Sequence, residues 1–589
     1  MYDWKEKGSE MKKTGLMLAI IVVMAVGLYF LVTARLGKVT AADFLPEEIL
    51  LAIEQQDLGR LLEDYKKSRL GLTITGIDYL KVASDLGMAP EEVEKIGGVI
   101  KQMGDFFKSP VFQEFFGKEF TLALLPVVDA NLTSPAKSVT GSLIFISRPS
   151  HDADILKLIS SIFIGKLNQT SIKHGKYSIH QVAIEEGIVL NVTTVQGYVI
   201  AALDLGLVQA SLDRFDNKTG SKKGTLAQSS EYIRLRHEFI DAKCFVYVSM
   251  PMLHDQAGRF AENLDIPEHD ELLKAIDQWK GWNGLAFGAW KEKGQIRNKG
   301  VALFNKEKLD PLVAKMCSVK ATENKTYAMV PADILGYYWT NTLNMGMFWE
   351  MFSREMQGSE EQLKAIEKEV KSSTGLELNQ ILAMFGSEAA VLMKEMVTDG
   401  FIPLPNGAIF LKIEKETDLL KMVKSQLAKM DIAIQAEEYK GVTLNTLDIS
   451  FHPSLRPVYV MHQGYLILAG SADMVKKIVD SQGGQGLSAE KSFQQVNEGL
   501  HKGLTGSNNS VSYIKFSSLL KMIKELANWG GAILAMQDTE TGQMSKVVLD
   551  QLIFPLLDGL AMYEVMGSRS VILDDALIME STMILAPVQ

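Results

Sequence analysis

Two carboxylates in this chain could do acid–base chemistry together. Glu119 and Glu388 each end a Gly-x-Glu triplet directly before an apolar run, in "FGKEFTLAL" and "FGSEAAVL". If the chain folds into two similar halves, both glutamates occupy equivalent positions, and paired carboxylates can serve as general acid and general base. Alternatively, each glutamate lies where a strand begins and binds nearby backbone N–H groups or a basic side chain. We favour this structural interpretation, because neither triplet contains a nucleophile or a base.

The histidines offer two clusters with metal-ligating residue types. The chain has nine histidines, and none shows the His-Glu-x-x-His spacing. The segment "HDAD" (His151–Asp154) precedes a helical pattern, where an aspartate is the expected N-cap. A second group of residues equally suits two solvated acidic helices, namely His254, Asp255, His269, Asp270 and Glu271. We therefore predict no metal site and no bound cofactor.

Sequence motifs of common enzyme classes are missing. The chain has no Gly-x-Ser-x-Gly elbow, phosphate-binding loop or dinucleotide fingerprint. Its net charge of −10 argues against a basic nucleic-acid surface. The one basic cluster, Lys218 with Lys222 and Lys223, is typical of a solvated loop. We predict no catalytic residues and no nucleic-acid partner.

An apolar segment near the N-terminus predicts a membrane anchor. Residues 15–33 carry no charge and are long enough, at about 1.5 Å per residue, to cross a bilayer. The basic residues that flank this segment are Lys5, Lys7, Lys12 and Lys13 before it and Arg35 and Lys38 after it. The positive-inside rule therefore predicts cytoplasmic residues 1–14 and an exported remainder, in a single-pass protein of the bacterial inner membrane. A secretory signal that starts at Met11 and is cleaved near Ala41 stays open as the alternative, although the length of the apolar run favours the anchor.

The two cysteines are too few for a disulfide framework. Cys244 lies in the alternating stretch "KCFVYVSM", which predicts a strand and a buried thiol. Whether Cys244 pairs with Cys317 stays open.

The chain repeats its own sequence pattern once. Phrases of the first half recur in the second in the same order and at nearly constant spacing, for example "QGYVIAALDLGLVQASLD" from Gln196 and "QGYLILAGSADMVKKIVD" from Gln463. A unit of this length is too long for a solenoid repeat. The pattern predicts a tandem duplication with copies at residues 44–306 and 326–587.

Each copy combines helical and alternating segments. Asp57 could cap a helix that runs to about Arg69, and a longer helical stretch is expected from about Tyr79 to Phe116. Short alternating runs follow, separated by turns such as "QG" that cannot hold a crossover helix, which predicts antiparallel hairpins. We expect an α+β fold of two homologous lobes, each an antiparallel sheet with helices packed on it.

The phrase "TGLELNQILAMFGSEAAVL" (Thr374–Leu392) resembles one that recurs in a bacterial domain-of-unknown-function family of exported proteins. Members share an N-terminal anchor, a Leu-Pro-x-acidic opening, here Leu45–Glu48, and a late Leu-Ser-x4-Phe phrase, here Leu487–Phe493. The first copy departs from this pattern, since Tyr232 replaces the phenylalanine. The resemblance implies the architecture and export, and no activity.

A methionine-rich segment is the best sequence candidate for a binding surface. It contains Met345, Met347, Phe348, Trp349, Met351, Phe352 and Met356. Such residues can line an adaptable apolar groove, but at helical spacing they more often belong to a core, which is the interpretation we favour.

These observations predict a non-enzymatic envelope protein, anchored through residues 15–33, that acts as a binding or scaffolding module for protein partners. The alternative is a carrier or chaperone for lipid or another apolar ligand in a groove on or between the lobes. A hydrolase comes third, because no residue constellation supports it.

Overall fold

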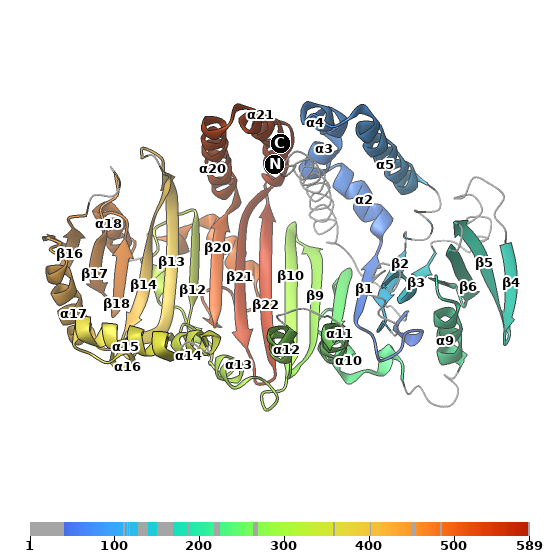
Figure 1. Ribbon diagram of the computed structural model, residues 1–589, viewed down its shortest axis with the longest axis horizontal. Helices are drawn as coiled ribbons and strands as arrows, with labels where there is room; N and C mark the ends of the chain where they lie inside the picture. Colours follow the sequence, from blue (N-terminus) through green and yellow to red (C-terminus); the bar gives the residue numbers. More distant parts are fainter. Residues whose placement is uncertain are drawn as a thin grey trace, which may run out of the picture. The chain divides into compact units, whose positions relative to one another are not determined.

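The computed structural model describes residues 41–586 and shows two compact units (Figure 1). The residues not described within this range are 110–111, 113, 115, 117, 128–138, 150–168, 186–187, 217–223, 263–268, 357–359, 401, 450–451, 453 and 483–485. Unit 1 contains the described residues up to Leu303 and Met544–Leu560, and unit 2 contains Phe304–Gln543 and the described residues from Ala561 onward. The predicted membrane segment 15–33 and the preceding residues 1–14 lie outside the described residues. Among the helices that are described, none combines the length and apolarity needed to cross a bilayer.

Unit 1 contains an antiparallel sheet in the order β10–β9–β8–β1–β2–β3–β7–β6–β5–β4. Its strands are β1 (Leu51–Gln56), β2 (Glu119–Leu124), β3 (Leu143–Arg148), β4 (Gln169–His174), β5 (Tyr177–Glu185), β6 (Ile188–Val195), β7 (Tyr198–Ala202), β8 (Cys244–Ser249), β9 (Trp282–Glu292) and β10 (Gln295–Phe304). The hairpins β4–β5, β5–β6 and β6–β7 are local, whereas β1 joins strands that lie far apart in the sequence.

Unit 2 contains a second antiparallel sheet in the order β22–β21–β20–β12–β13–β14–β18–β17–β16–β15. Its strands are β12 (Gly336–Thr340), β13 (Phe385–Val397), β14 (Leu404–Ile413), β15 (Ile434–Tyr439), β16 (Val442–Leu447), β17 (Val458–His462), β18 (Tyr465–Ala469), β20 (Ser510–Lys515), β21 (Tyr563–Ile572) and β22 (Ala576–Leu585). A separate two-stranded ladder joins β11 (Thr322–Glu323) to β19 (Ser507–Asn508). Strand for strand, the pairing order is the same as in unit 1. The predicted α+β class with antiparallel sheets is confirmed.

Two glutamine–glycine turns occupy matching places in the two sheets. Gln196–Gly197 joins β6 to β7, and Gln463–Gly464 joins β17 to β18. Their φ angles are 47° and 80° in the first turn and 50° and 78° in the second. Two successive positive φ values suit the twist of a tight antiparallel hairpin, and glycine adopts such a φ without steric cost. The "QG" pairs therefore form the predicted hairpin turns.

Helices fill the connections of each unit. Those of unit 1 are η1 (Ala41–Asp43), α2 (Leu58–Lys66), α3 (Arg69–Gly76), α4 (Tyr79–Asp85), α5 (Pro90–Lys108), α9 (Leu205–Asp216), η3 (Leu226–Gln228), α10 (Ser230–His237), α11 (Met250–Glu262), α12 (His269–Asp277), η6 (Leu549–Ile553) and α22 (Phe554–Leu560). Those of unit 2 are α13 (Pro311–Met316), η4 (Thr326–Met329), α14 (Met345–Glu355), α15 (Glu360–Thr374), α16 (Leu378–Leu382), α17 (Glu416–Lys429), α18 (Ala472–Asp480), η5 (Leu487–Ala489), α19 (Lys491–Gly499) and α20 (Phe516–Gln537), which α21 (Thr539–Val548) follows.

The first helices differ from the sequence expectation. Asp57 precedes α2, but it has a φ of 50° and its side chain caps no helical N–H group. Instead it accepts a hydrogen bond from Lys243 Nζ at 2.6 Å, so the cap prediction is wrong. The single long helix expected from Tyr79 is also wrong. The first helix, α4, ends before Gly87, which has a φ of 77°, and a new helix, α5, begins at Pro90.

The segment Met544–Leu560 falls within the predicted second copy, but it packs in unit 1. Gly559 of α22 lies against α3, where an added Cβ would stand 3.0 Å from Leu70 Cδ1 and 3.1 Å from Thr73 Cβ. Gln551 Nε2 donates to Asp85 Oδ2 at 2.7 Å. Close approach of the two helices is possible because residue 559 has no side chain.

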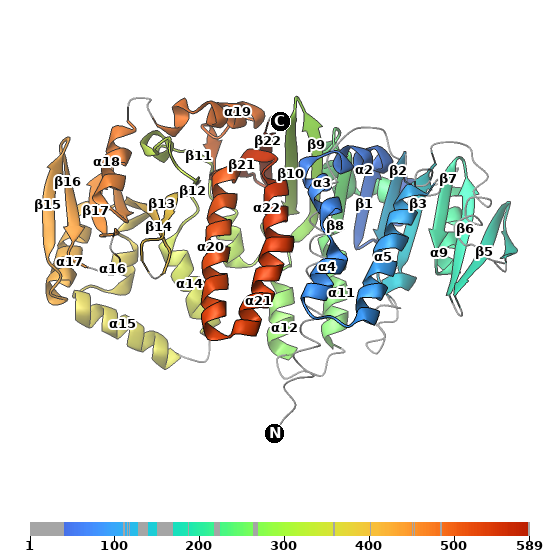
Figure 2. The same cartoon turned by 90° about the horizontal axis from the view of Figure 1, so that it is seen from above.

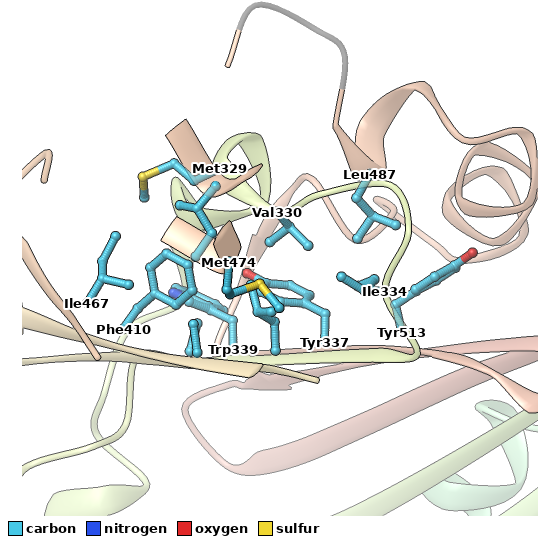
Figure 3. Close-up of a cluster of buried hydrophobic side chains, with 14 of the residues drawn as sticks. Met329, Val330, Ile334, Tyr337, Trp339, Phe410, Ile467, Met474, Leu487 and Tyr513 are labelled. Atoms are coloured by element: carbon cyan, nitrogen blue, oxygen red, sulfur yellow. The ribbon is translucent and has the colours of Figure 1, made fainter. Parts of the chain in front are cut away.

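Unit 2 has a core cluster on each face of its sheet. The smaller one packs Leu411 and Leu466 against Leu419 of α17, and the larger one lies on the other face. Tyr337 and Trp339 of β12 join Phe410, Ile467 and Tyr513 in a buried cluster, and Figure 3 shows these side chains standing on the same side of the strands. Other residues of this cluster come from the segments that cover this face, namely Met329, Val330, Met474, Val475, Ile478, Leu487, Phe493 and Val496. Because successive strand residues point to opposite faces, the residues between these core positions must point away from the cluster.

Candidate functional site

Glu119 lies in a polar cluster on the sheet of unit 1. It begins β2 and is buried. Tyr198 Oη donates a hydrogen bond to Glu119 Oε1 at 3.2 Å, and Arg148 Nη1 lies 3.8 Å from the same oxygen. The guanidinium of Arg148 also stands 5.7 Å from the centroid of the Tyr198 ring. Burial raises the pKa of Glu119, while Arg148 and Tyr198 oppose that rise.

Glu388 has a matching arrangement in unit 2. Tyr465 Oη donates to Glu388 Oε2 at 2.7 Å, and Lys412 Nζ lies 4.9 Å from the centroid of the Tyr465 ring. Lys412 is the cross-strand partner of Tyr465 on β14. Burial, followed by the bond to Glu388, raises the pKa of Tyr465. Each unit therefore combines a glutamate, a tyrosine and a cation.

These contacts bear on the structural interpretation of the two glutamates. Glu119 begins its strand as predicted, whereas Glu388 is the fourth residue of β13, where a register irregularity separates Phe385 from Ala389. Tyrosine hydroxyls donate to both carboxylates in place of the expected backbone N–H groups, and Arg148 is the expected basic side chain beside Glu119. Glu119 is thus held by a tyrosine and a cation of its own unit, and Glu388 by a tyrosine, which are contacts expected of carboxylates that stabilise the fold.

A buried glutamate that the sequence analysis missed lies near Glu119. Glu54 of β1 is buried and accepts a hydrogen bond from Tyr232 Oη, while Arg236 Nε lies 3.3 Å from its other carboxylate oxygen. Burial, partly offset by Arg236, raises the pKa of Glu54. Trp339 holds the corresponding position of β12 in unit 2. The tyrosine at position 232, where α19 of unit 2 has Phe493, was the available signal, since a hydroxyl at a core position needs a polar partner.

The predicted metal-like clusters do not form a metal site where they are described. Within the described ranges no three His, Cys, Asp or Glu side chains come together as metal ligands. His254 Nε2 lies 3.6 Å from Asp277 Oδ1, and His269 Nδ1 lies 3.5 Å from Asp270 Oδ1, so the two histidines pair separately. His151–Asp154 and the lysines at 218, 222 and 223 lie outside the described residues.

The cysteines are not bonded to each other. Cys244 and Cys317 are both free and buried. The predicted burial of Cys244 in a strand is confirmed, and this burial raises the pKa of its thiol to about 12. A thiol with such a pKa stays protonated at neutral pH and is a poor nucleophile.

The sheet of unit 2 exposes a row of apolar side chains on the face opposite its larger core cluster, beside the smaller cluster that contains Tyr459. Tyr338 pairs with Val391, Val391 with Ile409, and Ile409 with Leu468, so one residue from each of four adjacent strands lies in register. Their exposed fractions are 47%, 46%, 43% and 40%, respectively. We call these four residues the apolar row. A contiguous exposed row of this kind marks a binding surface more often than isolated apolar residues do.

The apolar row continues into hydroxyl groups. Ser512 on β20 is the next residue after Tyr338, and Ser568 on β21 follows it. The two hydroxyls lie 2.7 Å apart and hydrogen-bond to each other. We call Ser512 and Ser568 the serine pair. The line across the sheet is therefore apolar at one end and polar at the other.

The corresponding row of unit 1 is less exposed. Ile53, Leu122 and Phe145 lie in register on the same face and are half-buried. The Phe116 ring packs against Phe145, and their centroids are 5.2 Å apart. The chain thus places a hydrocarbon side chain over one member of this row in unit 1, and leaves all four members of the row in unit 2 exposed.

Helix α14 carries the methionine-rich segment, and the favoured core interpretation is wrong. Between positions 345 and 356, the residues whose side chains are described are all half-buried or exposed, with Phe348, Met351 and Phe352 exposed. Figure 2 shows α14 and α20 on the side of the sheet opposite α18 and α19, which is the side of the apolar row. The helix adds exposed apolar surface on that side of unit 2.

This chain shows little similarity to known proteins. No family model and no curated protein matches this chain. The solved structures that match are three crystal forms of TP0453, each 9% identical in sequence, with TM-scores of 0.21 to 0.23. These matches cover 45% to 49% of this chain and 81% to 89% of TP0453.

Proposed function

We propose that this protein is a non-enzymatic binding module of the bacterial cell envelope, anchored in the inner membrane through residues 15–33. We further propose that it consists of two homologous lobes that arose by duplication, and that unit 2 binds its ligand or partner through the apolar row. The observation that carries the proposal is the row itself, an uncovered set of four apolar residues in register on a sheet face.

Three features support the duplication. The strand order is the same in both units. The turns Gln196–Gly197 and Gln463–Gly464 share nearly the same φ values. The pairs Glu119–Tyr198 and Glu388–Tyr465 occupy corresponding strand positions of the two units. Features that recur in topology, turn geometry and side-chain contacts are expected when one ancestral lobe has been copied.

A non-enzymatic role is supported by the hydrogen bonds that the candidate acid–base carboxylates make within the protein. Tyr198 and Tyr465 donate to the carboxylates of Glu119 and Glu388, and Tyr232 donates to that of Glu54. Each of these carboxylates thereby accepts a hydrogen bond from a tyrosine of its own unit. General acid–base catalysis would instead require these carboxylates to reach a substrate.

The binding role is tested by photo-cross-linking in living cells. p-Benzoylphenylalanine is placed at position 409 in the apolar row, and at position 573 as the control. Leu573 is comparably exposed in unit 2 (44%) but lies in the turn after β21. We expect a discrete adduct from position 409 and none from position 573. If both positions give the same products, or neither gives any, the apolar row is not a binding surface.

A further inference from the structure

We propose that the apolar row binds one hydrocarbon chain of an amphipathic lipid, whose polar head lies over the serine pair. This inference rests on the proposed function and names the ligand class of the same surface. Strands in a sheet lie about 4.8 Å apart, so the three steps from Leu468 to Tyr338 span roughly 14 Å. One leaflet contributes about half of the ~30 Å hydrocarbon core of a bilayer. The row is therefore about as long as one lipid chain.

The polarity along the line matches an amphiphile. Leu468, Ile409 and Val391 offer only hydrocarbon, and Tyr338 presents a ring beside the serine pair. The hydroxyls of Ser512 and Ser568 can each both donate and accept, so they suit an oxygen-rich head of either charge. A purely apolar ligand would gain nothing from these hydroxyls and would have to desolvate them if it covered them.

A bound peptide strand fits this surface poorly. Strands β12, β13, β14 and β18 are each hydrogen-bonded to a neighbour on both sides, so none offers an edge for strand addition. An extended peptide laid across the row would place its backbone N–H and C=O groups over hydrocarbon, and unpaired buried groups of this kind are costly. A lipid chain has no such groups. The surface therefore favours a lipid over a peptide.

Unit 1 shows how one member of the same row is covered within the chain itself. There the ring of Phe116 lies over Phe145, with a centroid distance of 5.2 Å, and its centroid is also 5.0 Å from that of Phe120 on the neighbouring strand. The cover is a hydrocarbon side chain, and its contact with the row is a ring contact. In unit 2 a lipid chain would take the corresponding place over Ile409.

The test uses the full-length chain in its own membranes with a photoactivatable palmitic acid, a sixteen-carbon fatty acid that carries a diazirine near its end. After irradiation, labelled peptides are mapped by mass spectrometry. We expect label on peptides that contain Val391, Ile409 or Leu468. Label confined to other peptides would overturn the inference.

Two variants and a control sharpen this test. The threonine double variant combines Val391→Thr with Ile409→Thr. It keeps β-branched side chains but adds hydroxyl groups to the row, and should lower labelling about ten-fold. Ser512→Ala combined with Ser568→Ala removes both members of a hydrogen-bonded pair, and should weaken labelling without moving its site. Leu573→Thr should leave labelling unchanged. Equal labelling of the threonine double variant and the unaltered chain would sink the proposal.

The cross-linker at position 409 separates failure of this inference from failure of the proposed function. A discrete protein adduct from position 409, with no fatty-acid label on the row, rejects the lipid and keeps the binding role. No adduct and no label reject both. Thermal melts of all variants accompany the labelling, and the threonine double variant should melt like the unaltered chain because both side chains are about half-exposed.

Discussion

The hydroxyl of Tyr465 donates a hydrogen bond of 2.7 Å to Glu388. At the corresponding place in unit 1, the hydroxyl of Tyr198 donates a hydrogen bond of 3.2 Å to Glu119. The two pairs differ in burial, since Glu119 is buried and Glu388 is half-buried. They also differ in the nearby cation, which is Arg148 in unit 1 and Lys412 in unit 2. Both pairs join a tyrosine hydroxyl to a glutamate carboxylate. The same substitution, tyrosine to phenylalanine, therefore tests whether each pair stabilises the fold.

Removal of either tyrosine hydroxyl should destabilise the protein. Tyr198→Phe removes the hydrogen bond to a buried carboxylate, and should cost about 1–3 kcal/mol in the free energy of unfolding. Tyr465→Phe should cost less, because water can reach the half-buried Glu388. Urea unfolding measures both changes, with Tyr338→Phe as the control at an exposed position. If Tyr198→Phe has no more effect than Tyr338→Phe, the structural interpretation of Glu119 is wrong.

The buried carboxyl of Glu54 should make stability depend on pH. Because burial raises its pKa in the folded state, the folded state binds the proton more tightly than the unfolded state does. The resulting stabilisation is present at acidic pH and is lost as the pH rises through the folded-state pKa. Relative to Glu54→Gln, the unaltered chain should therefore lose stability over a pH range that begins near the ordinary glutamate pKa of about 4.3 and extends upward.

This pH dependence is measured by urea unfolding of both proteins across that range. Glu231→Gln serves as the control, because this glutamate is more exposed and lies on the helix that carries Tyr232. The effect assigned to Glu54 should be absent from the control. Parallel pH profiles for the unaltered chain and Glu54→Gln would show that Glu54 titrates alike in the folded and unfolded states.

The same glycine-to-alanine change should have opposite effects at two helical positions. Gly559→Ala brings a Cβ to within 3.0 Å of Leu70 Cδ1 and 3.1 Å of Thr73 Cβ, and should destabilise the packing of α22 on α3 by about 1–3 kcal/mol. Gly530→Ala in α20 meets no atom within 4 Å, and should stabilise the chain by about 0.5–1 kcal/mol. Chemical unfolding compares them. A stabilising Gly559→Ala would contradict the close contact between these helices.

The membrane topology can be tested with reporter fusions. The lysines before residues 15–33 predict that the C-terminus is exported. Alkaline phosphatase fused after Gln589 should be active, and a fusion that lacks residues 1–40 should be inactive because it stays in the cytoplasm. A reporter after Gln589 that works only in the cytoplasm would reverse the topology.

Sequence alone was enough for features whose cause is local. Alternation of apolar and polar residues indicated the strands, and it correctly predicted Cys244 as a buried strand residue. The glutamine–glycine pairs indicated the hairpin turns, because a tight turn depends on the φ values of its own two residues. Gly-x-Glu marked two carboxylates that the structure places at corresponding positions of two sheets.

Only the tertiary structure decided which faces are covered and which groups meet. Glu54 and Tyr232 are 178 residues apart, and only the packing of α10 on the sheet brings them together. The apolar row depends on the register of four strands, and alternation gives two faces without telling which one a helix will cover. For the same reason the spacing in α14 indicated a core helix, although the fold leaves Phe348 and Phe352 exposed. Burial depends on contacts between distant segments. The pattern of residue types along one segment does not show which distant segment will pack against it.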